Sequence, residues 1–156
     1  MMISDDEAKL YAAKLLSARP YSAAALAAKL TARGFGEETA DTVVAAFIEQ
    51  GYLDDAAYAQ TVARHYTAKG YGRRRVEAEL YRRGVDREIS REAVENLPEP
   101  DGTLDVLAEK LFADGDPDER ELRRFTDRMR RKGFDWQDIR DAVSRADARG
   151  DGGISI

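Results

Sequence analysis

The sequence predicts an all-α protein built as an elongated array of three tandem three-helix repeats. Two observations carry this prediction. Apolar residues recur at helical spacing along most of the 156 residues, and one such pattern occurs three times at a nearly constant interval. No segment alternates apolar and polar residues as a half-buried strand would. Hydrophobic residues make up 43% of the chain, which is enough to form packed cores.

The repeated pattern is an apolar residue, a second apolar residue four positions later, a basic residue, a glycine and another apolar residue. Its three glycines, Gly34, Gly84 and Gly133, lie 50 and 49 positions apart. This order is typical of a helix that ends at a left-handed glycine. A valine follows each glycine by ten positions, and a further apolar residue comes three positions later, and we expect both to face inward: Val44 and Phe47, Val94 and Leu97, and Val143 and Ala146.

The helix boundaries follow from this pattern and from capping residues. We expect helices near 5–18, 22–33, 37–50, 55–68, 72–83, 86–97, 103–113, 117–132 and 135–147. Ser22, Asp86 and Asp135 are the predicted N-caps of the second, sixth and ninth helices. For the eighth helix, Asp116 is the predicted cap, with Pro117 in the first helical position and Glu119 in the third.

Three units and a tail follow from these helices. We place the repeats at 1–53, 54–98 and 103–147, and a flexible tail at 148–156. The clearest break is the Leu-Pro-Glu-Pro-Asp-Gly link at 97–102. Small units in a row bury surface within themselves and against immediate neighbours, so the array is elongated. That shape suits binding along an extended partner better than enclosing a catalytic pocket.

Composition excludes several classes of site. The chain has no cysteine and one histidine, which excludes disulfides, thiolate zinc sites and most histidine-centred catalysis. No apolar run is long enough to span a membrane, and the acidic N-terminus is unlike a secretion signal. We therefore expect a cytoplasmic monomer without metal or cofactor. The net charge of −5 argues against a general nucleic-acid condenser.

Four features suggest chemistry but have simpler structural interpretations. Asp54-Asp55 is a carboxylate pair, and we interpret it as a turn with an N-cap. The segment 70–72 resembles the start of a phosphate loop but follows a helix, so we interpret it as an interhelical turn. His65 has no companion ligand or nucleophile. Trp136, at a helix start, is interpreted as a packing anchor, with base stacking as the alternative.

Two basic helix faces are the candidate binding surfaces. Residues 120–132 carry seven basic and two acidic side chains, and the basic ones are almost all arginine, which binds phosphate or carboxylate through two hydrogen bonds. The alternative is a solvated face satisfied by i, i+4 pairs such as Arg73–Glu77 and Arg123–Asp127. The predicted partner-binding residues are Arg74, Arg75 and Arg82 on the helix near 72–83, and Arg120, Arg124, Arg128 and Arg131 on the helix near 117–132.

Several motifs follow one another over roughly residues 8–146. They are Arg19 with Ser22, the glycine-ended helix at 26–35, the Gly-Tyr-Leu-Asp-Asp-x-x-Tyr-Ala run at 51–59, the Gly-Tyr-Gly at 70–72 and the glycine-ended helix at 76–85. In this order they resemble the RecX family, whose members regulate the RecA recombinase, and the motifs at 51–59 and 70–72 are the most specific part. The third repeat matches in physical pattern more than in wording, and Ala25 stands where an acidic residue is expected.

The resemblance implies tandem three-helix repeats and a non-enzymatic function. RecX-like proteins bind RecA and its DNA filament, and they inhibit filament extension, ATPase activity, strand exchange and coprotease activity. The alternative hypothesis is a free-standing helix-turn-helix-like module that binds single- or double-stranded DNA directly. The residues alone do not decide whether the arginine faces contact RecA carboxylates or DNA phosphates.

Overall fold

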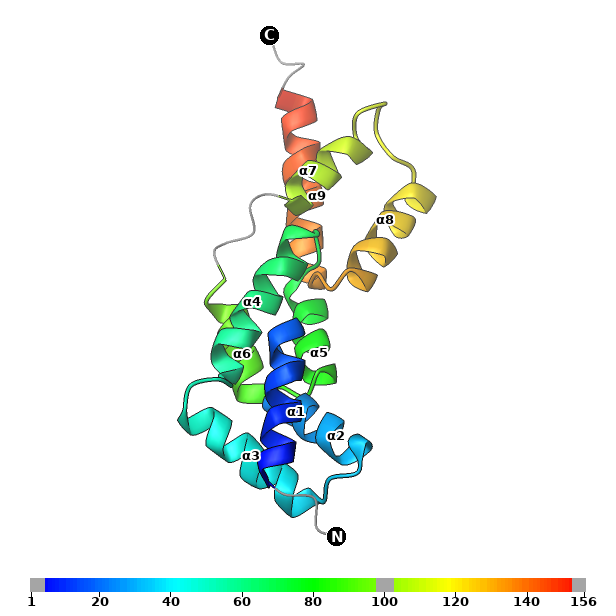
Figure 1. Cartoon of the computed structure of the whole chain (residues 1–156). Helices are drawn as coiled ribbons and strands as arrows, with labels where there is room; N and C mark the ends of the chain where they lie inside the picture. The colour runs from blue at the N-terminus through cyan, green and yellow to red at the C-terminus, as the bar shows by residue number, and fades with distance from the viewer. Residues whose placement is uncertain (1–4, 98–102, 153–156) are drawn as a thin grey trace.

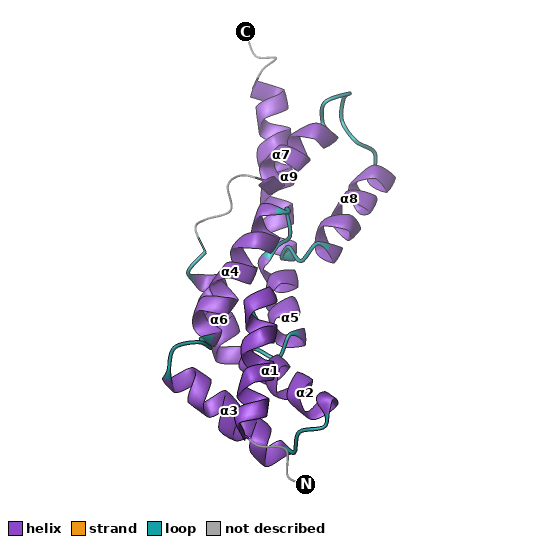
Figure 2. Ribbon diagram, viewed as in Figure 1, coloured by secondary structure: helices purple, strands orange, loops and turns teal. Residues whose placement is uncertain are grey.

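The computed structural model describes residues 5–97 and 103–152, and every regular element in those two ranges is an α-helix (Figures 1 and 2). The helices are α1 (Asp5–Ala18), α2 (Ala23–Arg33), α3 (Glu37–Glu49), α4 (Asp55–Ala68), α5 (Arg73–Arg82), α6 (Arg87–Glu95), α7 (Thr103–Leu111), α8 (Glu119–Arg131) and α9 (Trp136–Gly152). The all-α prediction is confirmed. Residues 98–102 of the predicted break at 97–102, and residues 153–156 of the predicted tail, lie outside the described residues.

The molecule has three separate hydrophobic cores along its length, one for each group of three helices. The helices in closest contact fall into three groups: α1, α2 and α3, then α4, α5 and α6, then α7, α8 and α9. Each of the closest pairs lies within one of these groups. The fully buried side chains that centre the three cores are Leu26, Leu30 and Val43, then Val76, Leu80 and Val85, then Phe125, Met129 and Ile139. We refer to these groups as the first, second and third units.

The middle helix of each unit ends as the repeated glycine predicts. Gly34, Gly84 and Gly133 have φ values of 110°, 86° and 98°, in the left-handed region. At the C-terminus of each of these three helices, the glycine N–H donates to the carbonyl of the residue three positions earlier. The N–H of the residue after the glycine donates to the carbonyl five positions before it. This pair of hydrogen bonds is the Schellman motif, and it satisfies carbonyls that the helix end would leave unpaired.

The inward side of the third helix in each unit is shifted from the prediction by one position. The valines predicted to face inward are only half-buried in the first and third units, and the residues before them, Val43 and Ala142, are fully buried. In the second unit Ala93 and Val94 are both buried. The apolar residues three positions later, Phe47, Leu97 and Ala146, are buried as predicted.

The helix starts confirm some predicted caps and correct others. Ser22 caps α2 as predicted, accepting a hydrogen bond from the Ala25 amide. The predicted start of α8 is wrong by two residues, because Asp118, and not Asp116, forms the cap in a reciprocal capping box with Glu121. Asp86 occupies the N-cap position of α6 without making a side-chain cap bond. At the other end of the chain, α9 continues past the predicted limit at 147 to Gly152.

The three units follow one another in a row, so the molecule is elongated, with α1 in the unit at one end and α9 in the unit at the other (Figure 1). The middle helices α2, α5 and α8 lie along one side of this row. The N-terminus of α2 meets the C-terminus of α5, and the N-terminus of α5 meets the C-terminus of α8. In the described part of the chain, no helix is both long and apolar enough to cross a membrane.

Candidate partner-binding surface

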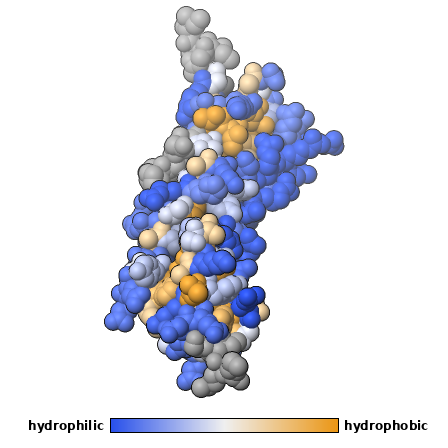
Figure 3. Space-filling model, viewed as in Figure 1, coloured by the Kyte–Doolittle hydropathy of each residue, from blue (hydrophilic) through white to orange (hydrophobic). Residues whose placement is uncertain are grey.

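Helix α8 presents a continuous arginine surface. Phe125 and Met129 face the core and are buried, and every arginine of the helix is exposed. Within the described residues, the predicted binding residues Arg120, Arg124 and Arg131 make no side-chain hydrogen bond or ion pair. Figure 3 shows the corresponding side of the molecule as strongly hydrophilic. These guanidinium groups are therefore available to an external anion.

Arg128 differs from the other predicted residues on α8. Its guanidinium carbon lies 5.7 Å from the centre of the Phe125 ring, which places it over the edge of the core. A cation at this distance from an aromatic face is attracted to the ring. Arg128 therefore has a structural contact in addition to its exposure.

Two further arginines of the same surface are not among the predicted binding residues. Arg123 and Arg130 are exposed on the side of α8 away from Phe125 and Met129. The proposed i, i+4 partner of Arg123 was Asp127, and no ion pair forms between them. Nor does the proposed Arg73–Glu77 pair form. Helical spacing is the sequence signal that could have included Arg123 and Arg130 among the predicted binding residues. Both lie on the side of α8 away from the buried Phe125 and Met129.

The predicted residues on α5 are engaged within the molecule. Arg74 forms an ion pair with Asp135 of the third unit, and the Nη1 of Arg75 donates to the Arg131 carbonyl at 3.3 Å. Arg82 pairs with Glu79 at 2.7 Å. The structure therefore brings Arg74 and Arg75 together with Arg131 of α8, and it places Arg82 at the opposite end of α5.

The contact between α5 and α8, which we call the second junction, is made mainly by backbone. The Gly72 amide donates to the Lys132 carbonyl at 2.7 Å, and the Arg74 amide donates to the Gly133 carbonyl at 3.1 Å. The two glycines allow this approach. A Cβ on Gly72 would lie 2.5 Å from the Gly133 carbonyl carbon, and a Cβ on Gly133 would overlap the backbone of Arg75.

The contact between α2 and α5, which we call the first junction, uses side chains. The Ser22 hydroxyl donates to the Arg83 carbonyl at 2.6 Å while it caps its own helix. The carboxylate of Asp55, on α4, accepts from the Ala23 amide at 2.8 Å. Asp55 thus supports the start of a helix in another unit, and Asp54 caps α4 itself. The structural interpretation of this carboxylate pair is confirmed.

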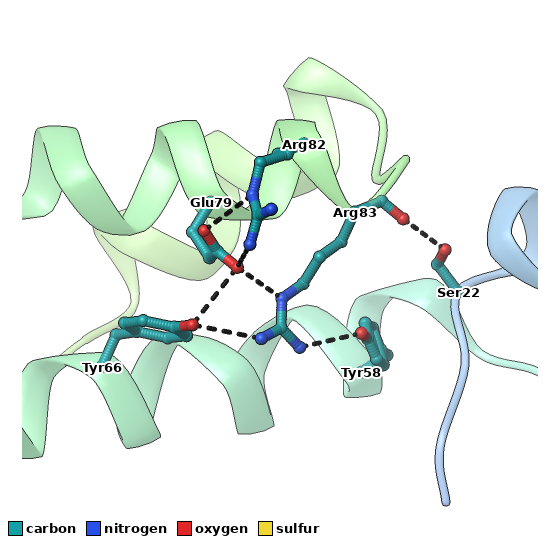
Figure 4. Close-up of polar contacts among 6 residues, drawn as sticks. All are labelled: Ser22, Tyr58, Tyr66, Glu79, Arg82 and Arg83. Carbon is teal, nitrogen blue, oxygen red and sulfur yellow. Dashed lines mark hydrogen bonds and ion pairs between the residues drawn. The ribbon is translucent and has the colours of Figure 1, made fainter.

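A polar network within the second unit fixes Arg83 beside the first junction (Figure 4). The Arg83 guanidinium donates to the Tyr58 hydroxyl at 3.1 Å, to the Tyr66 hydroxyl at 3.2 Å and to the Glu79 carboxylate at 3.0 Å. Arg82 donates to both oxygens of the same carboxylate. The network therefore connects α4 with α5, and through the Arg83 carbonyl it reaches Ser22 of the first unit.

Glu79 is the buried charge of this network, with 8% of its surface exposed. Hydrogen bonds from Arg82, and then from Arg83, outweigh the effect of burial and lower the pKa of Glu79 to about 2. Burial acts to lower the pKa of Arg83, but its hydrogen bonds to Tyr58, Glu79 and Tyr66 raise that pKa above its ordinary value. Helical spacing alone places Glu79 at the flank of the outward face of α5, and the structure corrects this because the side chain is buried.

The remaining features of the sequence analysis have structural explanations or corrections. The segment 70–72 is the expected turn, with Gly70 at a φ of 93°. His65 is exposed on α4 and packs edge-to-face with Tyr66. Trp136 is not the packing anchor that we expected, because half of its surface is exposed. Within the two described ranges, no group of three or more His, Cys, Asp or Glu side chains is placed to hold a metal ion.

Comparison with known proteins agrees with this architecture. Two family models match the chain, "RecX, first three-helix domain" over residues 8–46 and "RecX, second three-helix domain" over residues 54–94. The "Regulatory protein RecX" of Chromohalobacter salexigens is 34% identical over 140 residues, which cover 86% of this chain and 90% of the relative. That of Stenotrophomonas maltophilia is 35% identical over 131 residues, covering 83% and 80%.

A solved structure shows the same fold over most of the chain. The crystal structure of RecX from Lactobacillus salivarius matches with a TM-score of 0.84 and covers 92% of this chain and 97% of that one, at 19% sequence identity. The tandem units, the glycine-ended middle helices and the sequence similarity over most of the chain lead to one assignment. The chain belongs to the RecX family.

Proposed function

We propose that this protein is a non-enzymatic, cytoplasmic regulator of the RecA recombinase, binding RecA and its DNA filament and inhibiting filament extension. ATPase activity, strand exchange and coprotease activity of RecA then fall together, because all of them require the filament. The observation that carries the proposal is the similarity to proteins named "Regulatory protein RecX" over most of the chain. The name of these relatives indicates a regulatory protein. RecA as the regulated protein is what the family resemblance implies.

The shape and charge of the molecule support a partner that is long and anionic. Three units in a row present the middle helices along one side, and α8 adds exposed arginines without internal partners. Arginine forms paired hydrogen bonds with phosphate or carboxylate, and both groups occur on a nucleoprotein filament. A row of units that contacts successive filament subunits disfavours the addition of further subunits.

The experiment that tests this proposal is RecA ATPase activity on single-stranded DNA, with and without the purified protein. The protein should lower ATP turnover more strongly when it is added before filament assembly than after it, because extension is the step that it inhibits. An ATPase rate that the protein leaves unchanged in both orders of addition would reject the proposal.

A second measurement separates this function from that of a free-standing DNA-binding module. Binding to duplex DNA in the absence of RecA is measured over a range of salt concentrations. Tight, sequence-selective duplex binding whose affinity falls steeply with salt would favour the module. Weak and unselective duplex binding, together with ATPase inhibition, is the result that the regulator predicts.

A further inference from the structure

An open cleft lies at the first junction, between the first and second units. Its volume is about 740 Å³, within the usual range of ligand sites, and its lining comes from α2, α4, α5, α6 and the turn between α5 and α6. Ala23, Ala24 and the buried Val85 make part of this lining apolar. We call it the first-junction cleft. It shares no residue with the arginine surface of α8.

Two carboxylates line the first-junction cleft, and neither has a cationic partner among the described residues. Asp55 accepts from the Ala23 amide through Oδ1, and its Oδ2 has no partner in the described part of the chain. Asp86 is exposed at the N-cap position of α6, where its side chain makes no cap bond, and it forms no hydrogen bond or ion pair with any described residue. Arg87 is the basic residue among the described lining residues. Negative charge is therefore in excess in the cleft.

Tyr81 adds an exposed aromatic ring to the same cleft. Its exposed fraction is 59%, and it is not among the residues that pack into the second core. The Arg87 guanidinium lies 5.3 Å from the centre of this ring, a distance at which a cation is attracted to an aromatic face. The ring thus already attracts the guanidinium of Arg87, and the two carboxylates of the cleft stay unpaired.

We infer that the first-junction cleft binds an arginine side chain of a partner protein, with the guanidinium on Asp55 and Asp86 and the alkyl part of the side chain against Tyr81 and the apolar lining. A guanidinium presents a planar set of N–H donors that matches carboxylate oxygens, and it also packs on aromatic rings. The alkyl part of an arginine covers apolar surface while its charged end stays with polar groups. Lysine offers a compact charge and suits this combination less well.

A protein is preferred to a nucleic acid as the occupant because of the charges in the cleft. A phosphate entering it would meet two unpaired carboxylates, and like charges repel. This inference deepens the proposed function and rests on it for the identity of the partner, which is the RecA protein itself. The arginine surface of α8 suits anionic groups of the filament, and the first-junction cleft suits a cationic one.

The cleft is tested directly with the smallest probe that carries the ligand group. The isotopically labelled protein is titrated with N-acetylarginine amide and followed by NMR. The backbone amide signals of Ala24, Gly84 and Asp86, which line the cleft, should shift to saturation. N-acetylcitrulline amide has the same length without the charge, and it should bind about tenfold more weakly or less. Equal responses to the two probes, or no response to either, would overturn the inference.

A variant measures how much the unpaired carboxylate contributes. Asp86→Asn removes the charge and keeps a residue equally suited to the N-cap position, so α6 should be unaffected. We expect it to bind N-acetylarginine amide about tenfold more weakly than the original chain. The matched control is Glu92→Gln, the same change at an exposed residue of α6 that does not line the cleft. Equal binding by the two variants would overturn the role of Asp86.

The RecA ATPase assay tests the identity of the partner. Asp86→Lys should need about tenfold more protein than Glu92→Lys for equal inhibition, because the reversed charge repels the incoming arginine. Circular dichroism verifies that both variants keep their helices. If the two inhibit equally well, RecA does not use the cleft, so the inference is wrong and the regulator stands. If the original chain does not inhibit RecA either, the proposed function is wrong, and the titration alone decides whether the cleft binds arginine.

Discussion

The first and second junctions join equivalent helix ends by different means. In both, the N-terminus of a middle helix meets the C-terminus of the next middle helix along the row, α2 on α5 and α5 on α8. The first junction depends on the side chains of Ser22 and Asp55. The second depends on backbone hydrogen bonds between Gly72 and Lys132 and between Arg74 and Gly133.

In both junctions a donor at the start of one middle helix bonds to a carbonyl at the end of the next. The donor is a side-chain hydroxyl in the first junction and backbone N–H groups in the second. Both arrangements align the positive end of one helix dipole with the negative end of the next, which is favourable. The N-terminus of α8 behaves differently, because Asp118 and Glu121 satisfy it within their own helix. Helix α2 therefore has its own cap and also contacts the neighbouring unit, α5 has only the contact, and α8 has only its own cap.

The comparison predicts that the two junctions fail under opposite changes. The first should fail when a side chain is removed, and the second when one methyl group is added. The changes below are ordered from the largest expected effect to the smallest.

Gly133→Ala should be the most damaging of these changes. Its positive φ strains any other residue by about 1–2 kcal/mol, and the new methyl group would overlap the Arg75 backbone. We expect the free energy of unfolding to fall by about 3 kcal/mol or more in chemical denaturation followed by Trp136 fluorescence. The control is Gly34→Ala, which has the same helix-end conformation with no atom near the new methyl group. Equal losses in both variants would contradict the close contact.

Gly72→Ala isolates crowding from backbone strain. Its φ is −81°, an ordinary value, but the added methyl group would lie 2.5 Å from the Gly133 backbone. We expect a loss of about 2 kcal/mol in the free energy of unfolding, within the range for overpacked sites. Gly36→Ala is matched to it, because Gly36 is also an N-cap glycine with extended backbone and has open space around it. That control should change stability by less than about 0.5 kcal/mol.

Acid should weaken the network beside the first junction. The pKa of Glu79 is about 2 in the folded protein and 4.5 as its ordinary value, so its contribution to stability is complete above pH 4.5 and is lost as the pH falls toward 2. The stability difference between the original chain and Glu79→Gln should shrink by about 2 kcal/mol between pH 6 and pH 3. A difference that stays constant with pH would show that the carboxylate is not held as described.

Ser22→Ala should have the smallest effect of the four. It removes the cap of α2 and leaves the Arg83 carbonyl without its Ser22 partner, which together cost about 1–2 kcal/mol of unfolding free energy. Ser17→Ala removes an exposed hydroxyl that bonds only to a carbonyl of its own helix, so it is the control. A loss no greater than that of the control would mean that the Ser22 hydroxyl does not join the units.

The fold could be predicted because it depends on local patterns. The i, i+4 apolar pairs and the glycines after them specify where each middle helix packs and ends, and Gly34, Gly84 and Gly133 behave as predicted. The start of α8 was misplaced because Asp116 and Asp118 both offer an acceptable cap, and the choice depends on Glu121 reaching back to the cap.

The binding surface could be predicted only in part. Helical spacing places the arginines of α8 outward, but it does not show that Arg74 is paired with Asp135 or that Glu79 is buried. Both facts depend on how α5 packs against other helices, because Glu79 accepts a hydrogen bond from Tyr66 of α4 and Asp135 belongs to the third unit. The exposure of Trp136 has the same origin, since it depends on how the second junction is assembled.

The most direct test of this account compares two triple charge reversals in the RecA ATPase assay. Arg120→Glu, Arg124→Glu and Arg131→Glu remove three of the unpartnered arginines of α8. Lys14→Glu, Arg64→Glu and Arg91→Glu make the same change in net charge on α1, α4 and α6, at exposed residues whose side chains form no hydrogen bond or ion pair within the described part of the chain. Circular dichroism verifies that both variants keep their helices. We expect the α8 variant to need about tenfold more protein for equal inhibition, and the control to act as the original chain does. Equal inhibition by the two variants would contradict the assignment of the α8 surface.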